Sequence, residues 1–195
     1  AEFSALEAIG ERRDIWLHRF ATAAEQFLDF ERARNPFVRK RHAEIDGEWV
    51  LKLGEDITIQ GRADRVDELH DGTLEILDFK TGAPPGKASM RGFEAPQLPV
   101  EALMARANGL KNIPAAPASA LTYVKIGLGP DAFLPSAFAT PEGMSVMDMA
   151  DEIGRRLQGH AELFLLRRTP LPARLLPLKG QRFAGPYDHL ARVAE

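Results

Sequence analysis

The sequence predicts a single α/β (α+β) domain, in which a mixed β-sheet is flanked by helices. Two observations lead to this fold class. The first is the order of the periodic segments along the chain, which runs helix, several strands, helix, strand and helix. The second is size, because 195 residues with 45% hydrophobic content can bury a sizeable core without disulfide bonds or structural metals.

Three segments have the apolar spacing of amphipathic helices. They are residues 4–33, 97–107 and 144–167. Pro36 is expected to end the first helix, because proline cannot continue it. Asn108 is expected to end the second, where a glycine follows it.

The strands are expected between the first and the last helix. Residues 43–53 have the pattern of a short hairpin that turns at 46–47 (Asp-Gly). Alternating, β-rich sequence then fills residues 56–69 and 73–80, on either side of a turn at 70–72. The series is completed by a loop over 82–96, a buried strand over 118–126 and an irregular or strand segment over 129–141.

The whole chain, residues 1–195, is predicted to be one domain, because no linker or shift in composition divides it. It begins with a helical lead-in (1–36), continues through a core that carries the chemistry (43–126) and finishes with a helix and a wrapping tail (144–195). Because Ala1 is not methionine and a helical pattern follows at once, we expect the chain to be part of a longer polypeptide.

Composition excludes several kinds of site. The chain has no cysteine, which excludes thiolate zinc sites, cysteine-held iron–sulfur clusters and cysteine nucleophiles. The net charge of −3 means that nucleic-acid binding would depend on local groups of basic residues. No apolar run approaches the length of a membrane span, so we expect no membrane partner.

The densest group of polar residues falls on the strand pair at 56–69 and 73–80. Acidic residues are unfavourable in strands and costly to bury, so Asp64 and Asp78 call for an explanation. If the turn has three residues, Asp64 lies opposite Asp78 and Arg62 lies opposite Lys80, all on one face. A two-residue turn would instead place the two aspartates on different faces.

Two carboxylates that face each other repel, unless one takes up a proton or a cation lies between them. Mg²⁺ or Mn²⁺ is the natural cation, because hard divalent ions prefer oxygen ligands. Lys80 follows Asp78 by two residues and therefore shares its face. It could orient or deprotonate a water and stabilise charge on a phosphate.

The pattern Gly61-x-x-Asp64-Arg65-x-Asp67, followed by Asp78-Phe79-Lys80-Thr81-Gly82, resembles the nuclease core of the PD-(D/E)xK superfamily, RecB-like branch. Gln97 opens a helix after the lysine, as the glutamine of that branch's Gln-x-x-x-Tyr motif does, although Glu101 stands at the tyrosine position. The run Pro96-Gln97-Leu98-Pro99-Val100-Glu101-Ala102 is most similar to the C-terminal nuclease domains of AddB-type subunits from alphaproteobacteria.

The resemblance implies a restriction-endonuclease-like fold and metal-dependent hydrolysis of DNA phosphodiesters in double-strand break processing and recombinational repair. By position it implies four catalytic residues: Asp64, Asp78, Lys80 and Gln97. The implied metal ligands are Asp64, Asp78, the backbone carbonyl of Phe79 and, more loosely, Glu44. The implied ion is Mg²⁺, with Mn²⁺ as a substitute. The candidates for DNA contact are Arg62 and Thr81.

The same resemblance implies DNA and an AddA-like helicase subunit as partners, in the bacterial cytoplasm at the nucleoid. Two departures stand out. The branch usually carries a metal-binding histidine in a Gly-x-x-x-His context, which His18 does not have, so we expect that helix to precede Ala1. Some AddB-type domains hold an iron–sulfur cluster, for which this chain has no cysteine. The alternatives are a degraded nuclease fold that binds DNA or scaffolds a partner, and a stand-alone RecB-like exonuclease.

Other charged residues are given structural roles. Asp67 falls on the face opposite Asp64 and is predicted to pair with Arg65, and Glu101 is predicted to be an exposed helix charge. Two basic concentrations would contact phosphates only if they border the Asp64/Asp78 groove. They are Arg32, Arg34, Arg39, Lys40 and Arg41, and then Arg155, Arg156, Arg167, Arg168, Arg174, Lys179 and Arg182.

Overall fold

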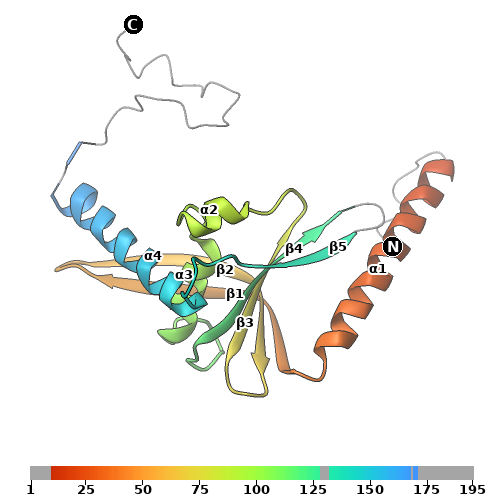
Figure 1. Cartoon of the computed structure of the whole chain (residues 1–195), viewed down its shortest axis with the longest axis horizontal. Helices are drawn as coiled ribbons and strands as arrows, with labels where there is room; N and C mark the ends of the chain where they lie inside the picture. Colours follow the sequence, from red (N-terminus) through yellow and green to blue (C-terminus); the bar gives the residue numbers. More distant parts are fainter. Residues whose placement is uncertain (1–9, 128–131, 168, 171–195) are drawn as a thin grey trace, which may run out of the picture. The chain divides into compact units, whose positions relative to one another are not determined.

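A mixed five-stranded sheet forms the centre of the computed structural model, which describes residues 10–127, 132–167 and 169–170 (Figure 1). The strands are β1 (Val38–Lys52), β2 (Asp56–Leu69), β3 (Leu74–Lys80), β4 (Ala118–Ile126) and β5 (Phe133–Ala137), and they follow this order across the sheet. Neighbouring strands are antiparallel except β3 and β4, which are parallel. The predicted mixed sheet flanked by helices is therefore confirmed.

Four α-helices accompany the sheet in the described part of the chain. They are α1 (Gly10–Arg34), α2 (Lys87–Arg91), α3 (Gln97–Arg106) and α4 (Val146–Ala161), after which Glu162–Leu166 forms a π-helical turn. Helices α2 and α3 lie in the connection between β3 and β4, because two parallel strands need a long crossover. Helix α3 packs against β1, β3 and β4.

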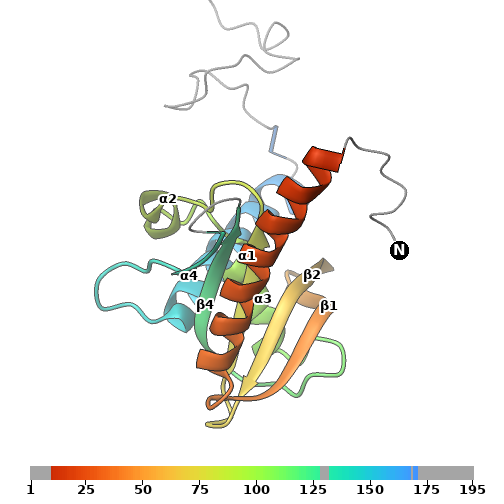
Figure 2. The same cartoon turned by 90° about the vertical axis from the view of Figure 1, so that its right-hand side faces the viewer.

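Helices α1 and α3 lie on opposite faces of the sheet, and Figure 2 shows α1 in front of the strands. Phe30 of α1 contacts Phe133 of β5 with ring centroids 5.0 Å apart, and Phe79 of β3 lies 6.2 Å from the same ring. Because side chains alternate along a strand, Asp78 and Lys80 project to the other face, the one that α3 covers.

Much of the core lies on this α3 face, whereas Leu77 and Val124, both 0% exposed, lie on the other face of the sheet. Six of the apolar residues on the α3 face are at most 1% exposed and come from the strands and from α3: Val66, Ile76, Leu98, Ala102, Leu121 and Tyr123. Helix α4 adds a further layer, because a Cβ at its Gly154 would lie 2.9 Å from Leu103 Cδ1 and 3.0 Å from the Trp49 ring. Strand, α3 and α4 are thus in close contact around that glycine.

The turn between β2 and β3 has the three-residue form that the sequence predicts. Gly72 has φ +86°, a left-handed conformation that glycine adopts without strain, and Leu69 N donates to Thr73 O at 2.9 Å. The ladder pairs Arg65 with Leu77 and continues to Glu68 and Leu74, which is the predicted register. This register places Asp64 and Asp78 on the same face.

Two local predictions are wrong. Residues 43–53 do not form a hairpin, because β1 runs unbroken through Asp46 and Gly47, which pair with Arg62 and Gly61 of β2. Gly47 instead permits a close approach, since a Cβ there would meet Leu110 Cδ2 at 2.8 Å. The predicted loop over 82–96 also contains the short helix α2.

The remaining elements follow the predictions within a few residues, although the chain divides into two units, residues 1–156 and 157–195. The single-domain organisation stays a prediction. The wrapping tail, apart from Thr169 and Pro170, lies outside the described residues, as does the start of the lead-in before Gly10. None of the helices among the described residues combines the length and apolar character needed to cross a membrane.

Candidate active site

Asp78 and Lys80 form an ion pair at the carboxyl end of β3. Lys80 Nζ lies 2.9 Å from Asp78 Oδ1 and 2.7 Å from Oδ2. The carboxylate is 2% exposed, whereas the lysine side chain keeps 32% of its surface exposed. The pair therefore has a buried acidic end and a basic end that solvent or a substrate can reach.

Gln97, the first residue of α3, ties this pair to the helix. Its Nε2 donates to Asp78 Oδ1 at 2.6 Å, and its Oε1 accepts a hydrogen bond from Lys80 Nζ at 3.1 Å. The amide thus hydrogen-bonds both charged groups, with its donor on the acid and its acceptor on the base, while Asp78 Oδ2 is buried without a hydrogen-bond partner among the described residues. The structure brings these three predicted catalytic residues together in one hydrogen-bonded group.

Asp64 of β2 lies beside this group. Its Oδ2 accepts a hydrogen bond from the backbone N–H of Phe79 at 2.8 Å. The β2–β3 ladder stops at Arg65 and Leu77, so the side chain of Asp64 occupies the place where the next backbone pairing would lie. The N–H of the peptide between Asp78 and Phe79 therefore holds that peptide against the carboxylate of Asp64.

Glu101 is the residue that the sequence interpretation placed wrongly. It is 4% exposed rather than a solvated helix charge, and its Oε1 accepts a hydrogen bond from Gln97 Nε2 at 3.3 Å. Burial, together with the negative charges of Asp78 and Asp64, raises the pKa of Glu101 to about 7, although the hydrogen bond from Gln97 lowers it. The available signal was its spacing of four from Gln97, which places both on one helix face.

Tyr123 of β4 is a second residue that sequence reasoning missed at this site. It pairs with Asp78 across the parallel β3–β4 ladder, and Lys80 Nζ lies 5.9 Å from the centroid of its ring. Burial, followed by the charges of Asp78 and Glu101, raises the pKa of Tyr123 to about 12. The ring thus closes the site from the β4 side and adds a cation–π contact to the lysine.

Other predicted residues lie less centrally. Arg62 is in an ion pair with Glu44 at 2.9 Å, with both side chains 59% exposed, and it does not pair with Lys80 because the ladder ends before that point. Glu44 has φ +57°, an unusual conformation within a strand. Thr81 is exposed just beyond β3. The roles of Glu44, Arg62, Thr81 and the Phe79 carbonyl stay predictions.

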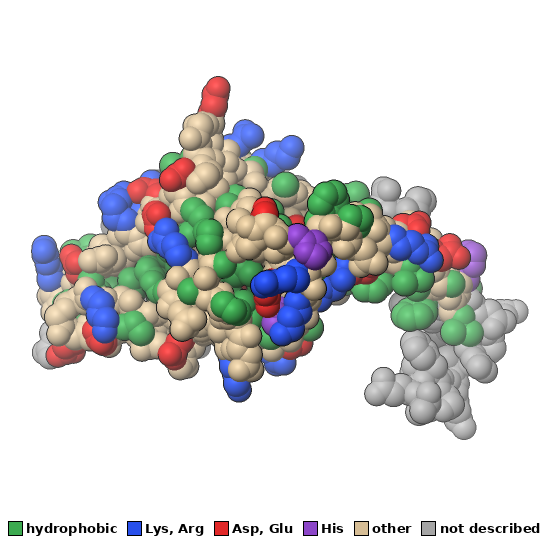
Figure 3. Space-filling model, turned by 90° about the horizontal axis from the view of Figure 1, so that it is seen from below, with side chains coloured by type: hydrophobic (Ala, Val, Ile, Leu, Met, Phe, Trp, Pro, Cys, Tyr) green, Lys and Arg blue, Asp and Glu red, His purple; other side chains and the backbone are tan. Residues whose placement is uncertain are grey.

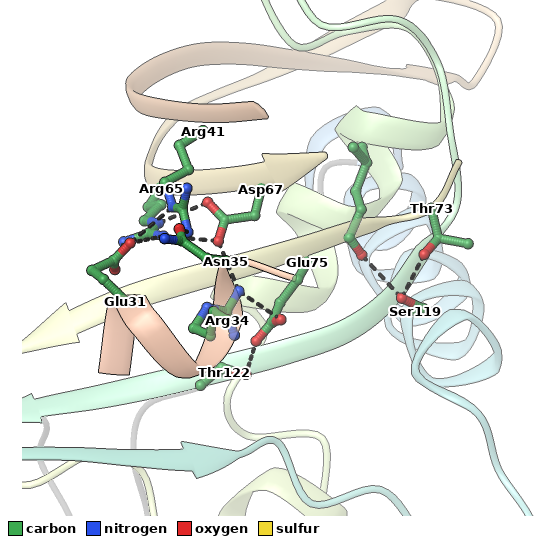
Figure 4. A network of polar contacts seen from close by, with 11 residues as sticks. Glu31, Arg34, Asn35, Arg41, Arg65, Asp67, Thr73, Glu75, Ser119 and Thr122 are labelled. Carbon is green, nitrogen blue, oxygen red and sulfur yellow. Dashed lines mark hydrogen bonds and ion pairs between the residues drawn. The ribbon is translucent and has the colours of Figure 1, made fainter. Parts of the chain in front are cut away.

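A second polar cluster lies on the opposite, α1 face (Figure 4). Arg65 donates to Asp67 Oδ1 at 2.7 Å and to Glu31 Oε1 of α1 at 2.5 Å, which confirms the predicted pairing of Asp67 with Arg65. Arg34 of α1 reaches both Asp67 (2.7 Å) and Glu75 (2.8 Å). This cluster attaches the end of α1 to the sheet. The thickness of the sheet separates it from the Asp78 group, which comprises Asp64, Asp78, Lys80, Gln97 and Glu101.

Most of the described basic residues that were candidates for phosphate contact are in ion pairs with neighbouring acids. The pairs are Arg32 with Asp29, Arg34 with Asp67 and Glu75, Arg39 with Glu68, Arg41 with Glu31, and Arg155 and Arg156 with Glu152. On the face seen in Figure 3, basic and acidic side chains are interspersed. The candidates at 168, 174, 179 and 182 lie outside the described residues.

The donor set of the Asp78 group suits a hard divalent cation. It contains three carboxylates (Asp64, Asp78 and Glu101) and one ammonium group (Lys80), so acidic groups outnumber basic ones. Glu101 Oε2 is buried and has no hydrogen-bond partner among the described residues. In the same part of the chain, no three acidic or histidine side chains lie close enough to hold one ion directly.

A separate pocket of about 840 Å³ opens between the β1–β2 strands and the segment after α3. Asp46, Glu48, Gln60 and Lys111 are among its lining residues. None of the residues of the Asp78 group lines it, so its size says nothing about the chemistry of that group.

Comparison with known proteins gives relatives of unassigned activity. An uncharacterized protein of Rickettsia typhi is 32% identical over 118 residues, which are 59% of this chain and 14% of that protein. An uncharacterized protein of Rickettsia bellii is 35% identical over 98 residues, 50% of this chain and 12% of that protein. The matched part thus spans about an eighth of these relatives. The crystal structure of SSO0001 is a distant likeness, with TM-score 0.39 and 16% identity, covering 80% of this chain and 68% of that one.

A family model gives the broader assignment. The model described as the PD-(D/E)XK nuclease superfamily matches residues 2–169. That range includes the whole sheet, α1 to α4, and every residue of the Asp78 group. The chain belongs to the PD-(D/E)XK nuclease superfamily and has its restriction-endonuclease-like fold.

Proposed function

We propose that this chain is a metal-dependent deoxyribonuclease domain that hydrolyses DNA phosphodiesters. The observation that carries the proposal is the group formed by Asp78, Lys80 and Gln97, with Asp64 beside it, in a member of a nuclease superfamily. A buried acid (Asp78), an accessible lysine (Lys80) and the amide that hydrogen-bonds both (Gln97) are suited to bind a phosphate and a water molecule side by side.

Each side chain has a distinct task in this proposal. Asp64 and Asp78 hold the divalent cation, Mg²⁺ or Mn²⁺, and the cation when bound supplies Lewis-acid activation and neutralises phosphate charge. Lys80, as the ammonium, would orient the attacking water through Nζ and stabilise negative charge on the phosphate. Gln97 keeps the ammonium in place, because its Oε1 is one of the acceptors of Lys80 Nζ.

We infer further that the domain acts within an AddB-like subunit, beside an AddA-like helicase subunit, in processing double-strand breaks in the bacterial cytoplasm. Two observations support this. The run from Pro96 to Ala102 is similar to that of AddB-type nuclease domains. The curated relatives are much longer than their matched segments, as expected if the nuclease is one part of a large subunit.

The test is DNA cleavage by the whole natural polypeptide that carries this sequence, with Mg²⁺ and with EDTA. We expect Asp78→Asn and Lys80→Met each to lower the cleavage rate by at least about 100-fold, because each removes a charge at the reacting centre. The matched controls Asp29→Asn and Lys52→Met change exposed side chains and should leave the rate unchanged.

Cleavage that continues in EDTA, or that survives both substitutions, would rule out this site. Intact DNA binding without cleavage by the unsubstituted polypeptide would favour the alternative, a nuclease fold that has become a binding module. A DNA-binding assay on the same samples therefore separates the two functions.

A further inference from the structure

One oxygen of the buried Glu101 carboxylate receives no hydrogen bond from the described part of the protein. One oxygen, Oε1, accepts a hydrogen bond from Gln97 Nε2. The other, Oε2, is buried without a partner among the described residues, and the residue as a whole is 4% exposed. A buried carboxylate oxygen without a donor is costly, so a donor or a cation from outside the protein would stabilise it.

The carboxylate belongs spatially to the Asp78 group. The same Gln97 Nε2 that donates to Glu101 also donates to Asp78 Oδ1, so one amide nitrogen bridges the two acids. Glu101 also interacts electrostatically with Asp64 and Lys80. The unpartnered oxygen therefore lies in a group whose negative charges are only partly balanced by Lys80.

A purely structural role explains this arrangement poorly. The neighbours of Glu101 on α3 include Leu98 and Ala102, both 0% exposed, and an apolar side chain at 101 would be buried there without any desolvation cost. The two N–H groups of Gln97 Nε2 are accepted by Asp78 Oδ1 and by Glu101 Oε1, so Gln97 accounts for one oxygen of Glu101 and leaves Oε2 without a donor. A ligand bound at the acidic group would supply the missing partner of Glu101 Oε2 and so account for a buried carboxylate at this position.

We propose that Glu101 is a third carboxylate of the divalent-cation site, and that it acts through the hydration water of the ion. The inference rests on the proposed function, since it assumes that Asp64 and Asp78 hold the cation. Direct coordination by all three acids is not available in the described part of the chain, where no three such side chains lie close enough. Mg²⁺ commonly keeps several waters, and each is a donor that Oε2 can accept.

The test is Mn²⁺ affinity by isothermal titration calorimetry, without DNA, on the whole natural polypeptide that carries this sequence. Glu101→Gln keeps the shape and removes the charge, and we expect it to weaken Mn²⁺ binding about tenfold, the usual size of an outer-sphere effect. Glu94→Gln is the matched control, because Glu94 is exposed and precedes α3, and its affinity should equal that of the unsubstituted protein.

A further variant separates charge from packing. Glu101→Asp keeps the charge, so it should bind Mn²⁺ more tightly than Glu101→Gln. Equal weakening by both variants, or unchanged affinity in Glu101→Gln, would overturn the inference. Thermal unfolding in EDTA verifies that each variant is folded.

Asp78→Asn, titrated in parallel, separates this inference from the function on which it rests. If Asp78→Asn weakens Mn²⁺ binding and Glu101→Gln does not, the inference about Glu101 is wrong and the proposed metal site at Asp64 and Asp78 stands. If the unsubstituted protein binds no Mn²⁺, or if Asp78→Asn binds as tightly as it does, both are wrong.

Discussion

Single residues at this site are balanced against one another by charge. Asp78 accepts hydrogen bonds from Lys80 and Gln97, and burial, followed by the charges of Asp78 and Asp64, raises the pKa of Glu101. Without a cation, protonation of Glu101 removes both the cost of burying its charge and its repulsion with Asp78 and Asp64. The stability of the metal-free protein should therefore depend on pH through this one carboxyl group.

The sign of that dependence follows from the raised pKa. Between pH 4.5 and about 7 the folded state keeps a proton on Glu101 that the unfolded chain releases. The contribution of protonated Glu101 to the free energy of unfolding is therefore full below pH 4.5 and is lost as the pH rises through 7. We expect the free energy of unfolding of the unsubstituted protein to fall between pH 5 and pH 8 by about 2 kcal/mol more than that of Glu101→Gln. Urea unfolding in EDTA at the two pH values measures this.

The exposed Glu94 provides the control for this experiment. Glu94→Gln should follow the unsubstituted protein at both pH values, because it changes an exposed side chain and leaves Glu101 in place. A parallel fall in stability for Glu101→Gln and the unsubstituted protein would mean that Glu101 is ionised in the folded state throughout this range.

At the level of secondary-structure elements, close backbone contact joins β1 to the end of α3. Glu48 N of β1 donates to Gly109 O at 3.0 Å, and a Cβ on Gly109 would lie 1.8 Å from Glu48 O. That contact is with backbone, which cannot rotate away as a flexible side chain can. The glycine that follows α3 is therefore needed for the approach to β1, beyond any role in ending the helix.

We expect Gly109→Ala to lower the free energy of unfolding by about 2 kcal/mol or more, since the two segments must separate to admit the methyl group. Gly159→Ala is the matched control, because a Cβ at Gly159 of α4 meets nothing within 4 Å. That control should be neutral or slightly stabilising, as alanine is favoured over glycine inside a helix. Equal stability of the two variants in urea would show that β1 and the α3 end are not held together.

The elements that the sequence predicted well were those with local signals. Alternation fixed β2 and β3, and the turn glycine at Gly72 set their register and so the shared face of Asp64 and Asp78. The hairpin expected at 46–47 failed because Asp-Gly is a turn signal only when the flanking strands pair with each other, whereas β1 pairs along its whole length with β2.

The parts of the site that were missed depend on contacts distant in sequence. Glu101 is an ordinary charge on a helix until α3 is laid on the sheet, and Tyr123 enters only because β4 is the parallel neighbour of β3. No periodicity within α3 or β4 contains that information. Gln97 could be assigned to the site because the family motif that it resembles implies a position beside the catalytic aspartate and lysine.

The whole chain carries a net charge of −3, and its candidate site is acidic, yet the proposed substrate is a polyanion. Many of the described arginines are already paired with acids, so they do not form a ready surface for phosphates. A divalent cation at Asp64 and Asp78 would reverse the local charge where the phosphate must approach. Metal binding should therefore precede or accompany productive DNA binding.

Because such a cation binds the folded chain and relieves repulsion there, it should stabilise the molecule as a whole by mass action. At a concentration 100 times the dissociation constant the gain is about 2.7 kcal/mol, which corresponds to a rise in Tm of about 5–10 °C for a chain of this size. We expect Mn²⁺ to give such a rise in a thermal unfolding experiment and excess EDTA to reverse it. Asp78→Asn should lose most of the rise while Asp29→Asn, which alters an exposed acid on α1, keeps it. A rise of the same size in Asp78→Asn would place the stabilising ion elsewhere in the protein.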